Sequence, residues 1–137
     1  MHIDKNNEEL CWISFLLRIS MASLFAVAAI GKFVGGLGAT VVRFQEIYKA
    51  TWLPLWMVTP YAHVIVFLEV IVAVWLLSGY KLKEAWIFTS AVLISLAFGM
   101  AVAQQYATAA DNYMYVVICC LGLYVSRFDR CGLGIRK

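Results

Sequence analysis

Four apolar stretches, each long enough to cross a lipid bilayer, constrain this chain more than any other feature. They cover residues 10–34, 61–79, 85–103 and 109–128. A membrane-spanning helix needs about 20 consecutive apolar residues, and its backbone polar groups must be satisfied within the helix. Charged residues make up only 14% of the chain, against roughly 25% in soluble domains. The sequence therefore predicts an all-α integral membrane four-helix bundle, with residues 1–137 as a single transmembrane domain.

The long connection between the first two stretches predicts a further, short helix. "GGLG" interrupts the first helix, and we expect Gly31, Gly35 and Gly36 to form a loop hinge there. In "ATVVRFQEIYKATW", helical spacing separates an apolar face (Val41, Phe44, Ile47, Tyr48) from a charged one (Arg43, Glu46, Lys49). Pro54 and Pro60 are expected to end this segment before the second span begins. The sequence thus predicts a short amphipathic helix in the outer loop. This helix either lies on the outer membrane surface or folds partly back into the membrane.

The distribution of positive charge predicts an orientation. Four spans place both termini on one side of the membrane. Seven basic residues lie on that side (Lys5, Lys81, Lys83, Arg127, Arg130, Arg136 and Lys137), and three lie on the other (Lys32, Arg43 and Lys49). Because loops rich in Lys and Arg stay in the cytoplasm, we expect cytoplasmic N- and C-termini.

Charged residues within the apolar stretches are the candidate site. Arg18 lies in the first span and Glu69 in the second, and counting from the span ends places both near mid-membrane. A charge at that depth requires a partner, so we expect Arg18 and Glu69 to pair. Lys32 returns to the face of Arg18 at the outer end, where Asn112 opens the fourth span. Two interpretations stay open: an ion pair that fixes helix register, or a buried polar core that binds a headgroup, a quinone carbonyl or a protonatable substrate.

Other chemistry receives little support from the residues. His63 has no second histidine or carboxylate at helical ligand spacing, so we expect no metal site and no cofactor held by this chain alone. The formal charge of +3 is too small to indicate a nucleic-acid partner. The expected surroundings are the lipid bilayer and other protein subunits.

One set of residues resembles a known family. "LLRISMASLFAVAAIGKFVGGLGATVVRF", a loop with proline, and then "FLEVIVAVWLLSGY" are similar to the DoxX family of small four-helix bacterial membrane proteins. The specific part is Arg18, Gly31-Lys32 and Glu69, and an asparagine opening the fourth helix is similar to Asn112. The residues after Glu69 depart from the family pattern. The resemblance implies a bacterial inner membrane protein that takes part in redox work with membrane or periplasmic partners.

Three functions are compatible with these observations. The first is a subunit of a quinone-linked membrane redox complex, without a metal or flavin of its own. The second is a non-catalytic scaffold or assembly subunit of a larger membrane complex. The third is a small lipid-binding or transport module, although four spans without inverted repeats disfavour an autonomous transporter. Whether the chain is itself part of an enzyme is left open by its sequence.

Overall fold

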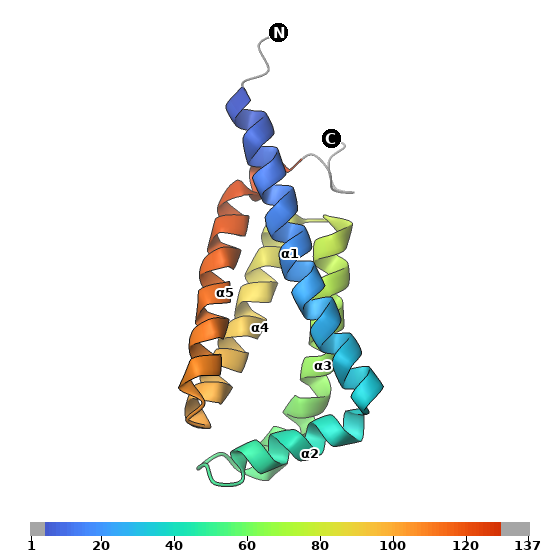
Figure 1. Cartoon of the computed structure of the whole chain (residues 1–137), viewed down its shortest axis with the longest axis vertical. Helices are drawn as coiled ribbons and strands as arrows, with labels where there is room; N and C mark the ends of the chain where they lie inside the picture. Colours follow the sequence, from blue (N-terminus) through green and yellow to red (C-terminus); the bar gives the residue numbers. More distant parts are fainter. Residues whose placement is uncertain (1–4, 130–137) are drawn as a thin grey trace.

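The computed structural model describes residues 5–129, and helices account for almost all of them. The elements are α1 (Lys5–Gly35), α2 (Leu37–Tyr48), α3 (Leu55–Ser78), α4 (Leu82–Val102), α5 (Tyr106–Val125) and the short 3-10 helix η1 (Ser126–Phe128). No strand occurs within the described range. The predicted all-α four-helix bundle is thus confirmed, with α2 as the additional helix (Figure 1).

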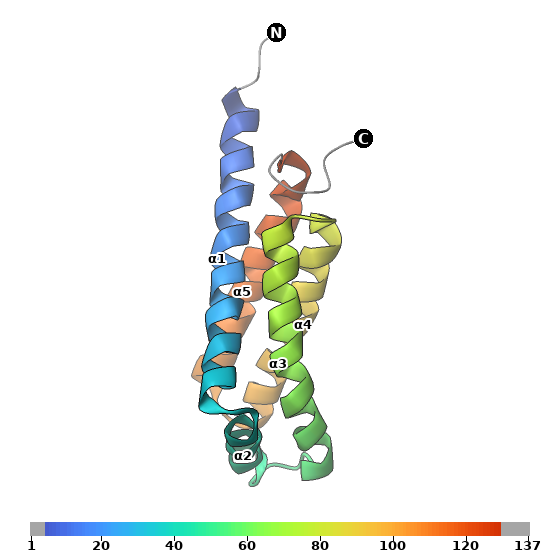
Figure 2. The same ribbon diagram turned by 90° about the vertical axis from the view of Figure 1, so that its right-hand side faces the viewer.

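The four long helices run side by side, and α2 lies across one end of the bundle (Figures 1 and 2). α1 packs mainly against α3, and α4 packs mainly against α5. α1 begins and η1 ends at the opposite end, where α1 extends beyond the other helices. We call these two ends of the bundle the α2 end and the terminal end.

Four helices are long and apolar enough to cross a membrane: Asn7–Gly35, Leu55–Ser78, Leu82–Val102 and Tyr106–Phe128. The chain is therefore a multi-pass membrane protein. The four predicted spans correspond to these helices one for one. The second spanning helix, α3, begins earlier than the predicted residue 61, however, because Pro54 is its N-cap and Pro60 lies inside it. A proline close to a helix start removes only one backbone hydrogen bond, so α3 continues through it.

The amphipathic helix predicted between the first two spans is present as α2. It buries Thr40, Val41, Phe44 and Tyr48 against the bundle. The break between α1 and α2 falls at Gly36, whose φ of 91° is a conformation that glycine adopts without strain. Thr40 and Gln45 secure α2, donating hydrogen bonds to the Gly36 carbonyl and to Thr59 Oγ1, respectively. Through these buried side chains and the hydrogen bond to α3, α2 packs across this end of the bundle.

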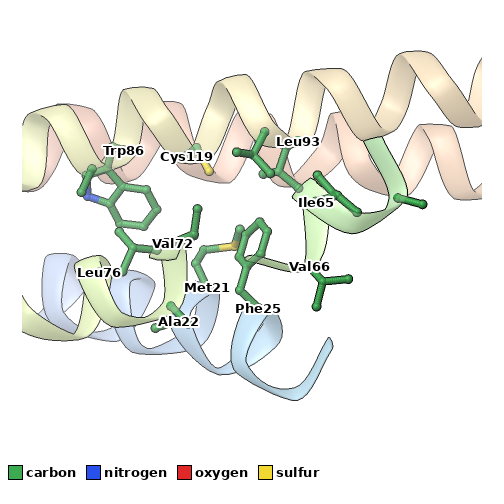
Figure 3. Close-up of a cluster of buried hydrophobic side chains, with 14 of the residues drawn as sticks. Met21, Ala22, Phe25, Ile65, Val66, Val72, Leu76, Trp86, Leu93 and Cys119 are labelled. Carbon is green, nitrogen blue, oxygen red and sulfur yellow. The ribbon is translucent and has the colours of Figure 1, made fainter. Parts of the chain in front are cut away.

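The interior of the bundle is filled by apolar side chains from all four long helices. Figure 3 shows Met21 and Phe25 of α1 pointing toward the side of the bundle from which Val72, Leu93 and Cys119 come, the last two at the top of the view. Trp86 on α4 is fully buried near the terminal end. Because lipid tails are as apolar as these side chains, close packing rather than hydrophobic transfer favours this association.

Three of the basic residues used in the charge count, Arg130, Arg136 and Lys137, lie outside the described residues. The cytoplasmic placement of the termini therefore stays a prediction.

Candidate functional site: a polar cavity at the α2 end

An ion pair between α1 and α3 forms the centre of the candidate site. Lys32 Nζ donates a hydrogen bond to Glu69 Oε1. The Glu69 side chain is 3% exposed and that of Lys32 is 25% exposed. The two charges therefore differ in their surroundings: the carboxylate is enclosed by the bundle, and the ammonium reaches its edge. The pair gives each of these two charges an opposite charge as its partner, as a charge within a membrane-spanning helix requires.

The second oxygen of Glu69 has no partner. Within residues 5–129, no side chain or backbone group donates a hydrogen bond to Glu69 Oε2. A buried carboxylate oxygen without a donor is unfavourable by roughly 1–3 kcal/mol or more. The Glu69 side chain also lines a cavity of about 340 Å³. The terminal torsion of a glutamate is soft, so the carboxylate can turn to accept a hydrogen bond from a donor placed in that cavity.

All five α-helices contribute to the wall of this polar cavity. Its polar lining consists of Lys32, Thr40, Arg43, Glu69, Gln105, Thr108 and Asn112. Its apolar lining consists of Phe44, Ile47, Leu96 and Met100. The volume and the mixture of a few polar groups with apolar walls are typical of a small-molecule site.

The charges around the cavity do not cancel. Lys32 and Arg43 contribute two positive charges, and Glu69 contributes one negative charge. Arg43 extends from the exposed face of α2 and forms no ion pair with any residue that the structure describes. Asn112 Nδ2 donates to the Thr108 carbonyl, which leaves its side-chain oxygen available as an acceptor. The cavity is thus suited to a neutral polar or an anionic group rather than to a cation.

The expected pairing of Arg18 with Glu69 is wrong. Arg18 Nη1 instead lies 3.2 Å from Asp129 Oδ2 at the terminal end, and Ser14 Oγ donates to the same oxygen at 3.1 Å. The prediction counted depth from the ends of the apolar stretches. Arg18 contacts Asp129, which follows η1, so it lies at the terminal end of the bundle, and Lys32 is the basic residue that pairs with Glu69.

The structure therefore divides the predicted site residues between two locations. Lys32, Glu69 and Asn112 line one cavity, and Arg18 belongs to a separate ion pair. Their role in binding a ligand remains a prediction. Of the predicted hinge residues, Gly31 lies inside α1, Gly35 ends it, and Gly36 alone lies in the connection.

Two residues of these sites were missed from sequence. The sequence places Arg43 on the charged face of α2 and does not include it among the site residues, but it lines the cavity because α2 lies across the bundle end. Asp129 follows η1 and is flanked by Arg127 and Arg130, so it was not distinguished from the basic loop. An acidic residue directly after the last span is the signal that could have identified it. Among residues 5–129, no three His, Cys, Asp or Glu side chains are grouped so that they could hold a metal ion.

The fold and this cavity define a class: a small polytopic membrane protein with a buried ion pair beside a polar cavity. A family model described as methylamine utilisation protein MauE matches residues 10–113, and the chain belongs to that family. This match shows that the assignment to the DoxX family suggested by the sequence is wrong. The resemblance rests on an arginine, a Gly-Lys pair and a glutamate, whose charged members form ion pairs within an apolar bundle. Such residues in apolar helices do not by themselves assign a chain to one family. No curated protein and no solved structure matches the chain.

Proposed function

We propose that this protein is a membrane subunit of a redox pathway and that the polar cavity binds the ring of a quinone. The observation that carries the proposal is the enclosed Glu69 carboxylate, with one oxygen paired to Lys32 and the other lacking a donor beside the cavity. Lys32 and Arg43 supply donors for quinone oxygens. Glu69 Oε2 supplies an acceptor for a hydroxyl of the reduced form. The apolar walls match the ring itself.

The family description supports the redox part of the proposal. The family description names MauE as a methylamine utilisation protein. Methylamine is a reduced one-carbon amine, so its use as a nutrient requires oxidation and a carrier for the electrons released. A quinone is a carrier that dissolves in the bilayer where this protein resides. Methylamine itself is a cation at neutral pH, and the excess positive charge of the cavity disfavours it as the ligand.

The test is to isolate the full chain in lipid nanodiscs and to quantify co-purifying quinones and proteins by mass spectrometry. Glu69→Gln replaces the acceptor oxygen and weakens the pair with Lys32. Because Lys32 is partly exposed, its ammonium can reach the interface, and the variant should fold. Glu46→Gln makes the same chemical change on the exposed face of α2 and serves as the control.

We expect quinone close to one per chain in the wild type and in Glu46→Gln. In Glu69→Gln we expect at least a tenfold loss. Equal amounts of quinone in all three preparations would contradict the proposal. Stable partner proteins without quinone in any preparation would also contradict it, and would favour the scaffold function.

A further inference from the structure

A second cavity adjoins the polar cavity on the side of α1 and α2. It has a volume of about 470 Å³, and its lining comprises Val27, Ala28, Gly31, Lys32, Gly35, Ala39, Thr40 and Arg43. Lys32, Thr40 and Arg43 line both cavities. The two spaces therefore meet at the same polar side chains. We call the second space the α1–α2 groove.

Small residues leave the α1–α2 groove open. A Cβ atom added at Gly31 or Gly35 would meet nothing within 4 Å, and Ala28 and Ala39 complete this part of the lining. No side chain of the described residues fills the space in front of the two glycines. The groove is thus an unfilled channel along the last turns of α1 and not a place where two helices pack closely.

The groove opens on the exposed surface of α1. Val27 on its rim is 70% exposed, and Gly31 and Gly35 are exposed as well. These residues belong to Asn7–Gly35, a helix long and apolar enough to cross a membrane, so we infer that its exposed side chains here face lipid. A molecule dissolved in the bilayer consequently meets the groove directly, without passing through water.

The two cavities together have the shape of an amphipathic site. The inner cavity offers Lys32, Arg43 and the unpaired oxygen of Glu69. The outer groove offers small, lipid-exposed residues that lead away from those polar groups. The polar head of an amphipathic ligand would lie against the polar groups of the inner cavity, and its apolar chain would lie against the small residues of the groove.

We propose that the α1–α2 groove holds the proximal part of the isoprenoid chain of a quinone whose ring lies in the polar cavity, so that the ligand enters sideways from the bilayer between α1 and α2. This proposal rests on the function proposed above. It adds the ligand class, a ring with an attached hydrocarbon chain, and the route of access.

The test compares two probes on the full chain in nanodiscs. One is 2,3-dimethoxy-5-methyl-1,4-benzoquinone, which has no chain, and the other is the same ring with a decyl chain. Both are supplied at matched mole fractions in the membrane. Retention on immobilised discs is quantified by mass spectrometry, and retention on protein-free discs is subtracted.

The informative variant is Gly31→Leu, which fills the groove with a side chain. Gly38→Leu is the matched control, because Gly38 is also helical, also has open space around an added Cβ, and lines neither cavity. We expect Gly31→Leu to reduce retention of the decyl probe at least tenfold and to leave the chain-free probe within twofold of wild type. Gly38→Leu should leave both probes unchanged.

Several outcomes overturn the assignment of the groove. If Gly31→Leu retains the decyl probe as well as wild type does, the chain does not lie in the groove, although the proposed function stands. The same conclusion follows if Gly38→Leu loses the decyl probe equally. If Gly31→Leu releases a co-purifying phospholipid and keeps both probes, the occupant is an acyl chain. If wild type retains neither probe, the proposed function itself fails.

Discussion

Arg18 on α1 and Asp129 after η1 form a buried ion pair, with Nη1 and Oδ2 3.2 Å apart, although they lie near opposite ends of the sequence. The side chains are 3% and 0% exposed, and Ser14 donates to the same Asp129 oxygen. This contact joins the first spanning helix to the end of the last one. It therefore closes the bundle at the terminal end, as α2 covers the other.

Removing Asp129 should strongly destabilise the protein. Asp129→Ala leaves the Arg18 guanidinium buried without this carboxylate, which costs about 3–5 kcal/mol. The free energy of unfolding, measured by titration with SDS in mixed micelles, reports the loss. Asp111→Ala, at an exposed position of α5, is the control and should change it by less than about 0.5 kcal/mol. A double-mutant cycle with Arg18→Leu isolates the coupling of the pair, and additive effects would contradict the interaction.

The two partners of the cavity pair should not be equivalent in stability. Lys32→Met leaves the enclosed Glu69 carboxylate unpaired and should cost about 3 kcal/mol. Glu69→Gln leaves a lysine that is 25% exposed and can reach the interface, so about 1 kcal/mol is expected. The same SDS titration compares them. A larger effect for Glu69→Gln would show that the ammonium, not the carboxylate, depends on the pair.

Gly122→Ala should destabilise the contact between α4 and α5. An added Cβ at Gly122 would lie 2.5 Å from the ring of Trp86, which is fully buried, so the ring or the helix must shift. Overpacking of this kind costs about 1–3 kcal/mol. Gly38→Ala is the control: it meets open space in a helix and should be neutral or stabilising by up to about 1 kcal/mol. Thermal unfolding in detergent distinguishes the two, and equal melting temperatures would contradict the close contact.

Tyr48 on α2 should make stability sensitive to alkaline pH. Burial, with a smaller contribution from nearby Tyr61, raises the pKa of Tyr48 from its ordinary value of 10.0 to about 12. The unfolded chain loses this phenol proton near pH 10, whereas the folded protein keeps it to about 12. The associated stability is complete below pH 10 and is lost as pH rises through 12. Tyr48→Phe should remove about 1–2 kcal/mol of the fall over this range, measured by detergent unfolding at each pH. An identical fall in the variant would contradict the assignment.

Much of the fold could be predicted from the sequence because hydrophobic run length and glycine placement act locally. The four spans, the break before Leu37 and the apolar face of α2 all follow from spacing and composition. The start of α3 did not. Pro54 and Pro60 were both interpreted as terminators, but one caps the helix and the other is tolerated inside it.

The candidate site was predicted only in part, since pairing depends on relative depth. Three of the four predicted site residues, Lys32, Glu69 and Asn112, line one cavity, and their role in binding a ligand stays a prediction. The partner of Glu69 was wrong because hydropathy does not report how far α1 extends beyond its neighbours. The place of Arg43 in the cavity wall depends on the direction in which α2 crosses the bundle end, and no local sequence pattern encodes that direction.

The contact of Ser14 and Arg18 with Asp129 also has a consequence for biogenesis. Ser14 and Asp129 are separated by 115 positions. At a synthesis rate of about 5–20 residues per second, on the order of ten seconds pass between the two leaving the ribosome. During that interval the nascent first helix carries an arginine without its acceptor. The first of the four spanning helices is therefore tethered only after the fourth has been synthesised, and release of the first helix from the insertion machinery should await the fourth.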